Sequence, residues 1–232
     1  EDAPTELVDG SQQAAEWLLA QGEFAIRRGQ VRWVDEARRA PPLVLQDVDF
    51  VLRNSLRRHE FRLDATPPPE LGQRASLRGR FRHGLFVNRF DWRQWVGELY
   101  AELPQADVDA LRPHVDLPVE LLGGLGAARV WVDVDRGRMK GATADVALRD
   151  VSLRWPGVAE TMAFSRFDGR LLARQDAQSV TLGLERVGFT TGQGQTWPAS
   201  DMKLVLRHAP AATGAASTQK PLERPVERPV AQ

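Results

Sequence analysis

Apolar side chains recur at every second position along most of the chain, while Arg, Asp and Gln occupy many intervening positions. Successive side chains of a β-strand point to opposite faces, so a period of two predicts strands with one apolar and one polar face. The alternating sets are Phe24 and Ile26; Val31 and Trp33; Leu43 and Leu45; Val48, Phe50 and Leu52; Phe61 and Leu63; Leu77 and Phe81; Leu99, Ala101 and Leu103; Val130, Val132 and Val134; Val146 and Leu148; and Leu182 and Leu184. The pattern predicts a mainly β protein built as an extended, antiparallel, twisted meander.

The alternation breaks between Leu45 and Val48, which share a face only if the strand has a bulge between them. Residues 44–50 are similar to residues 147–153 and, more loosely, to residues 183–189. Related stretches at separate places in one chain indicate copies of one structural unit. We therefore expect one bent strand to occur three times.

Two segments carry helix signals instead. Residues 11–21 contain Trp17, start at a Ser cap candidate and precede Gly22. Residues 106–111 lie between two prolines, with Asp107 as the candidate cap. Capping residues and breakers at these positions predict one or two short helices.

Charge and composition exclude several functions. The 31 Lys and Arg residues balance the 31 Asp and Glu residues, so no net field supports binding of a nucleic acid. The absence of cysteine excludes disulfides, thiolate metal sites and a cysteine nucleophile. No apolar run approaches the roughly 18 residues that cross a bilayer, and we interpret the chain, which begins at Glu1, as a piece of a longer protein.

The histidines give no metal signature. None of the four is spaced so that two ligands share one element, and each has arginine neighbours or a loop position, which predicts exposed or weakly hydrogen-bonded side chains. The four are His59, His83, His114 and His208. We expect no metal and no cofactor.

Catalytic motifs are also missing. The run Gly123–Gly126 lacks a phosphate-loop register, so we interpret it as a flexible segment that leads into a strand at residues 127–134. No Ser lies in a nucleophile elbow. Four aspartates could form an acid–base pair or a calcium site, but nearby cations predict ordinary ion pairs on a polar sheet face. These aspartates are Asp133, Asp135, Asp145 and Asp150. We expect no catalytic residues and no enzyme.

Tryptophan is frequent, with seven residues against one tyrosine. Trp33, Trp131 and Trp155 fall within alternating stretches, and Trp33 and Trp155 share the register of the apolar face. Two explanations remain open. These side chains fill a core, or they line a surface that accepts lipid or sits at a membrane interface.

Longer stretches resemble a known family. Residues 29–35, followed by residues 42–52, resemble the signature of AsmA-like proteins, in which a short strand ending near Asp leads into a leucine-alternating strand. Residues 95–111, 117–120 and 126–132 are similar to the YhdP branch of that group. The resemblance extends from about residue 17 to residue 155.

The resemblance implies a periplasmic β-sheet rolled into an open groove that helps to move phospholipid between the inner and outer membranes of Gram-negative bacteria. The implied partners are phospholipid acyl chains, an inner-membrane anchor segment and neighbouring groove segments of the full-length protein. The groove floor is then expected to bind lipid through Phe24, Ile26, Trp33, Leu45, Val48, Phe50, Leu52, Val132, Val134, Leu148, Val151, Leu153, Leu182 and Leu184.

On this interpretation the chain divides into a flexible segment at residues 1–10, a β-groove domain at residues 11–208 and a disordered Pro- and Ala-rich tail at residues 209–232. Residues 84–124 are a possible subdivision of the groove domain. Two alternatives use the same alternation. One is a closed β-sandwich that serves as an interaction or adhesion module, and the other is a hydrolytic β domain with two converging carboxylates.

Overall fold

The computed structural model describes residues 13–35, 40–114, 120–154, 160–176 and 178–207. Ten β-strands make up most of this part of the chain. The strands are β1 (Glu23–Trp33), β2 (Leu43–Asn54), β3 (Arg58–Thr66), β4 (Ala75–Arg82), β5 (Val96–Asp107), β6 (Glu120–Asp135), β7 (Arg138–Arg154), β8 (Thr161–Gln175), β9 (Ser179–Thr191) and β10 (Thr196–Arg207). The segments predicted at residues 1–10 and 209–232 lie outside the described residues.

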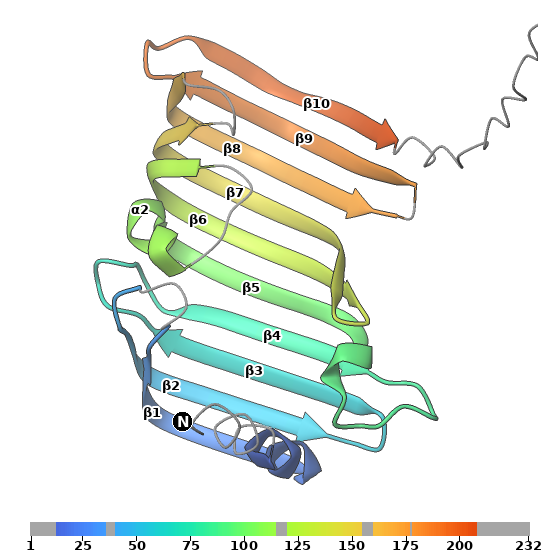
Figure 1. Ribbon diagram of the computed structural model, residues 1–232. Helices are drawn as coiled ribbons and strands as arrows, with labels where there is room; N and C mark the ends of the chain where they lie inside the picture. Colours follow the sequence, from blue (N-terminus) through green and yellow to red (C-terminus); the bar gives the residue numbers. More distant parts are fainter. Residues whose placement is uncertain (1–12, 36–39, 115–119, 155–159, 177, 208–232) are drawn as a thin grey trace, which may run out of the picture.

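All ten strands form one antiparallel sheet in sequence order, from β1 to β10 (Figure 1). The sheet twists and does not close, so β1 and β10 are its two edges. The predicted antiparallel twisted meander is confirmed. The alternative of a closed β-sandwich is wrong, because the described strands belong to a single layer. In the described parts of the possible subdivision, residues 84–114 and 120–124, β5 pairs with β4 on one side and with β6 on the other.

Short helices lie at both places where the sequence predicts them. Residues 13–20 form a helix that precedes β1, and α2 (Val108–Leu111) follows β5. The Asp107 carboxylate caps α2 by accepting hydrogen bonds from the backbone N–H groups of Asp109 and Ala110, at 3.0 and 3.2 Å. Single 3₁₀ turns, η1 (Trp92–Gln94) and η2 (Arg112–His114), are the other helical segments of the described residues. No helix in the described ranges has the length and apolar character needed to cross a bilayer.

The predicted bent strand occurs three times. Asp47, Asp150 and Arg186 have positive φ angles of 47°, 53° and 51°, and each interrupts the regular alternation of its strand. The residue that follows each of them is a buried valine, with 1% to 5% of its surface exposed. These valines are Val48, Val151 and Val187. Each bulge restores the valine to the apolar face.

Glycines on the preceding strands make room for two of these valines. Gly124, with φ of 139°, lies beside Val151, and a Cβ at this position would approach the valine Cγ2 to 3.2 Å. Gly169, with φ of 145°, lies beside Val187, where the corresponding approach is 2.7 Å. Only glycine adopts these φ values readily. Each glycine therefore permits the backbone conformation and also leaves space for the valine.

Some elements differ from the sequence prediction. Gly123–Gly126 belongs to β6 and not to a flexible segment ahead of it. Strands β8 and β10 have no counterpart among the predicted alternating stretches. In β8, Phe164 and Phe167 pair with residues of the same face of β7. Because these two phenylalanines are three positions apart, the period of two is not visible in the sequence of β8.

Candidate functional site

The strand register places a continuous apolar surface on one face of the sheet. Directly paired residues of antiparallel strands share a face, so each strand pair extends a row of neighbouring side chains across the sheet. Two rows cross all ten strands without a charged residue. The Phe24 row is Phe24, Leu52, Phe61, Gly79, Leu99, Val132, Ala142, Ala173, Leu182 and Leu204. The Ile26 row is Ile26, Phe50, Leu63, Leu77, Ala101, Val130, Ala144, Leu171, Leu184 and Met202.

These rows are long on the scale of a lipid. Ten strands leave nine intervals of roughly 4.8 Å, so each row spans about 43 Å. The hydrocarbon core of a bilayer, which holds two opposed layers of acyl chains, is about 30 Å thick. The apolar face is therefore longer than the hydrocarbon core of a bilayer is thick.

The structure places every predicted floor residue on this apolar face. Five strands contribute them. They are Phe24, Ile26 and Trp33 of β1; Leu45, Val48, Phe50 and Leu52 of β2; Val132 and Val134 of β6; Leu148, Val151 and Leu153 of β7; and Leu182 and Leu184 of β9. Val48, Leu52 and Val151 are buried and serve as core, whereas Ile26 and Trp33 have 36% and 59% of their surface exposed.

The residues predicted from the sequence come from only five of the ten strands that make up the apolar face. Strands β3, β4, β5, β8 and β10 continue both rows between and beyond the predicted residues. The alternation of Phe61, Leu63 and Leu77 was visible in the sequence and could have extended the prediction to β3 and β4. The register of β8 was not visible, because its two phenylalanines are three positions apart.

Aromatic side chains concentrate in two parts of the apolar face. On β1–β4, ring centroids of Phe24, Phe50, Phe61 and Phe81 follow one another at 6.3 to 6.4 Å. A second cluster joins β8, β9 and β10, where centroid separations are 5.2 to 6.0 Å. It contains Phe164, Phe167, Phe189 and Trp197. Between the clusters the face is lined by smaller side chains such as Ala101, Val130 and Ala144.

Two histidines interrupt this apolar face at one end of the strands, and the prediction that they are exposed or weakly bonded is wrong. His59 and His83 have only 2% and 6% of their surface exposed. The His59 ring stacks on Trp95 at 3.9 Å, and His59 Nδ1 hydrogen-bonds Asn54 Oδ1 at 2.8 Å. Burial, helped by the nearby His83 and Arg89, lowers the pKa of His59 to about 4. His59 is therefore neutral at physiological pH.

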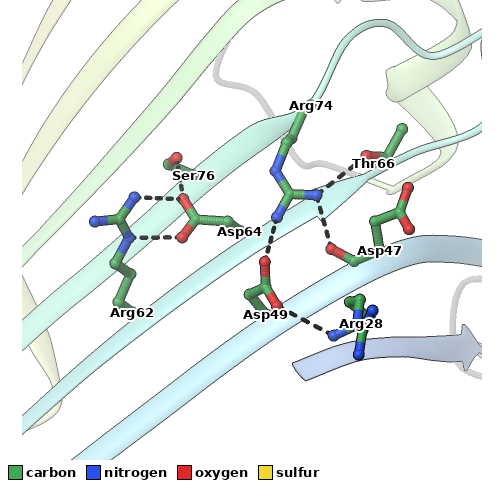
Figure 2. A network of polar contacts seen from close by, with 8 residues as sticks. All are labelled: Arg28, Asp47, Asp49, Arg62, Asp64, Thr66, Arg74 and Ser76. Carbon is green, nitrogen blue, oxygen red and sulfur yellow. Dashed lines mark hydrogen bonds and ion pairs between the residues drawn. The ribbon is translucent and has the colours of Figure 1, made fainter. Parts of the chain in front are cut away.

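The opposite face of the sheet is polar and ion-paired (Figure 2). Arg74 donates to the Asp47 carbonyl at 2.7 Å and to the Asp49 carboxylate at 2.9 Å. Asp49 also accepts the backbone N–H of Arg28, whose φ is 51°, at 3.1 Å. The backbone N–H of Arg186 is held in the same way by Asp201, at 2.7 Å. Polar-face carboxylates thus support the bulges that shape the apolar face.

Within the described residues, the polar face holds carboxylates among arginines. It holds a shallow hollow of about 810 Å³ that includes Asp49, Glu60 and Asp64 among several arginines. Partial burial would raise the pKa of Asp64, but hydrogen bonds from Arg62 and Ser76 and the charge of Arg62 outweigh burial and lower it. A group that stays ionised in this way is a poor general acid.

The predicted acidic residues of β6 and β7 are likewise engaged or dispersed. Asp145 accepts two hydrogen bonds from Arg170, at 2.6 and 2.9 Å, and these bonds lower its pKa. Asp135 pairs with Arg136 at 3.8 Å, and Asp150 forms a bulge. Across the described residues, no group of three or more metal-ligating side chains comes together.

The tryptophans take different positions. Trp33 lies on the apolar face at the β1 edge, with 59% of its surface exposed. Trp131 lies on the polar face, where its ring centroid is 5.2 Å from that of Tyr100. Trp155 lies outside the described residues. Of the two explanations for these residues, core filling does not describe Trp33.

A family model described as YhdP protein matches residues 2–223. The match covers nearly the whole chain. This protein belongs to the YhdP family. The resemblance of the strand motifs to the YhdP branch of AsmA-like proteins is confirmed by this match. Searches of curated proteins and of solved structures gave no significant match.

Proposed function

We propose that this YhdP-family protein is a non-enzymatic segment of a lipid carrier in the bacterial envelope, and that its apolar face shields phospholipid acyl chains from water. The observation that carries the proposal is the pair of apolar rows that cross all ten strands of an unclosed sheet. Family membership supports it through the role implied by the resemblance, and with it a periplasmic location between the inner and outer membranes.

The energetics of lipid transfer require this kind of surface. Moving an acyl chain into water costs about 0.8 kcal/mol per CH₂ group, or on the order of 12 kcal/mol for a chain of about 16 carbons. An apolar surface that covers the chain removes much of that cost. The Phe24 row and the Ile26 row supply such a surface and keep charged side chains on the other face.

The proposed chemistry is binding alone. Acyl chains would lie against the apolar rows, and head groups would remain in water, so the role needs no nucleophile, metal or cofactor. The carboxylates with lowered pKa values, Asp64 and Asp145, are held by arginines on the polar face and take no part.

The free edges suit a segment of a longer carrier. The backbone groups on the outer sides of β1 and β10 have no strand partner within the described part of the chain. Open edges of this kind pair readily with further strands. In the proposed arrangement they join neighbouring groove segments of the full-length protein, and an inner-membrane anchor segment holds the assembly.

Native mass spectrometry with lipid extraction tests the proposal. The protein, purified without detergent from a bacterial host, is expected to carry phospholipid. The double variant Phe50→Asp and Leu148→Asp, which places charges on the apolar face, is expected to lose it. A lipid-free native protein that takes up no fluorescent acyl lipid would contradict the proposal.

A matched control uses the other face of the same strands. Val51 and Arg149 are the neighbours of Phe50 and Leu148, and they pair with Arg62 and Arg166. The double variant Val51→Asp and Arg149→Asp therefore adds the same side chains opposite arginines. It should keep the bound lipid, and both double variants should show the circular dichroism of the native sheet.

A further inference from the structure

Three adjacent turns at one end of the strands concentrate positive charge. We define the rim as residues 54–58, 82–95 and 135–139, which link β2 to β3, β4 to β5 and β6 to β7. The rim contains seven arginines and two aspartates, although the whole chain is balanced. The arginines are Arg57, Arg58, Arg82, Arg89, Arg93, Arg136 and Arg138. The loops at the opposite end, in their described parts (34–35, 40–42, 66–75, 107–114, 160 and 191–196), carry five carboxylates and two arginines.

The three turns of the rim touch one another. The backbone N–H of His83 donates to the Arg57 carbonyl at 3.2 Å, and Arg57 Nε donates to the His83 carbonyl at 3.3 Å. The backbone N–H of Arg136 donates to the Trp95 carbonyl at 2.9 Å. The rim is therefore one continuous surface (Figure 1).

Large apolar side chains project from the rim into solvent. Phe86 and Leu56 have 102% and 87% of their surface exposed, and Leu85 and Trp92 have 72% and 55%. Arginines lie against rim aromatic rings, with the Arg89 guanidinium 4.6 Å from the Phe90 centroid and that of Arg93 4.8 Å from the Trp92 centroid. Side chains of this size are costly to leave in water, so their exposure together marks an interaction surface.

We propose that the rim docks on the surface of an anionic lipid bilayer. Arginines beside exposed aromatic and aliphatic side chains match the two layers of such a surface, the phosphate head groups and the start of the acyl region. The rim has an excess of five positive charges, which complements anionic lipid and contrasts with the opposite loops. This docking is separate from the proposed holding of acyl chains on the apolar face, because the rim side chains belong to neither apolar row.

The absence of cysteine allows a single environment-sensitive label at position 86. The Phe86→Cys protein labelled with NBD is expected to show blue-shifted, brighter fluorescence with vesicles that contain phosphatidylglycerol. A label at Val205→Cys, exposed on the polar face of the β10 edge, is expected to change much less. A label at position 86 that stays in water while the protein binds the vesicles would overturn the proposal.

Charge variants give the second readout, sedimentation with vesicles of phosphatidylcholine with or without phosphatidylglycerol. Each basic residue near an anionic membrane contributes about 1 kcal/mol, or about fivefold in partitioning, so Arg89→Glu with Arg93→Glu is expected to weaken binding by at least 25-fold. The matched variant, Lys203→Glu with Arg207→Glu on β10, should bind like the native protein. Equal losses in both, or none in either, would contradict rim docking.

Two further measurements distinguish docking of the rim on a bilayer from lipid binding on the apolar face and from binding of single lipid molecules. Rim variants should keep any co-purified phospholipid, and the Phe50→Asp and Leu148→Asp variant should still sediment with anionic vesicles. A fluorescence change at position 86 with monomeric short-chain phosphatidylglycerol, equal to that with vesicles, would overturn docking on a bilayer and assign the rim to individual head groups.

Discussion

Two neighbouring rows of side chains, one on each face of the sheet, have opposite chemistry. The Phe24 row crosses all ten strands with apolar residues and a single glycine at β4. One residue earlier on β1, the Glu23 row begins with six charged residues, the first five of alternating sign, and continues through the same strands. Its first six members are Glu23, Arg53, Glu60, Arg80, Glu98 and Asp133.

The difference shows what fixes the register of this single-layer sheet. A slip of one residue in any strand would place charges among the apolar row and apolar groups among the charges. The sheet has no second layer in its described part that could hide such an error. Register is therefore specified by the sequence of each strand, and the same alternation makes one face apolar.

A charge in the Phe24 row is expected to destabilise the sheet more than any other change considered for the two rows. Leu52 is 5% exposed, whereas its neighbour Val51 lies on the polar face opposite Arg62. Leu52→Asp is expected to lower the free energy of unfolding by about 4 kcal/mol or more, because a carboxylate would be buried without a partner. Val51→Asp should change it by no more than about 0.5 kcal/mol. Urea denaturation compares the two variants, and similar losses would contradict the assignment of faces.

A glycine on the apolar face gives the next largest effect. A Cβ on Gly126 would press against the Ala147 carbonyl oxygen and lie 2.8 Å from Leu148 Cα, both backbone atoms of the neighbouring strand. Gly126→Ala is expected to cost about 2 to 3 kcal/mol in unfolding free energy through this overpacking. On the polar face, Gly183→Ala places its Cβ 3.4 Å from Leu172 side-chain atoms, an ordinary contact, and should be nearly neutral. Thermal unfolding of both variants tests the difference.

His59 is a titratable group on the apolar face. Its pKa is about 4 in the fold and 6.5 as the ordinary value, so the folded protein favours the neutral ring. The stabilisation is complete above pH 6.5 and is lost as the pH falls toward 4, which amounts to about 2 kcal/mol at pH 5. Denaturation midpoints between pH 7.5 and pH 5 measure this loss. The His59→Phe variant should show a flatter profile, and an unchanged slope would assign the effect to other groups.

The smallest effect is expected in the Glu23 row itself. Arg80 and Glu98 lie 4.0 Å apart, and more than half of each side chain is exposed to water. Water and salt screen such pairs, so Arg80→Ala is expected to change the free energy of unfolding by less than about 0.5 kcal/mol. A larger loss, measured by urea denaturation, would mean that individual polar-face pairs hold the register, which the alternation otherwise explains.

Much of the fold could be predicted because local alternation and tertiary structure agree. The bulge at Asp47 and its counterparts at Asp150 and Arg186 followed from one break in the period of two. Strands β8 and β10 were not predicted. In β8 the apolar residues Phe164 and Phe167 are irregularly spaced, and in β10 the apolar residues lie on an exposed edge.

The chemistry of individual side chains was harder to predict. His59 follows Arg57 and Arg58 in the sequence, which suggested exposure, yet it lies an even number of positions from Phe61 and Leu63. This even spacing was the signal that could have placed His59 on the apolar face. Its burial also depends on stacking with Trp95, which is distant in sequence and reaches it only through the fold. Contacts of that kind leave no local pattern.

The most direct test of the proposed lipid groove compares one position from each row on a single strand. Leu99 belongs to the Phe24 row and Glu98 to the Glu23 row, both on β5 near the middle of the sheet. Single cysteines at these positions, labelled with NBD in an otherwise cysteine-free chain, are exposed to phospholipid that carries a doxyl quencher on its acyl chain. Strong quenching at position 99 with little at position 98 is the predicted result. Equal quenching at the two positions, or none at position 99 in protein that retains its sheet, would contradict the binding of acyl chains on the apolar face.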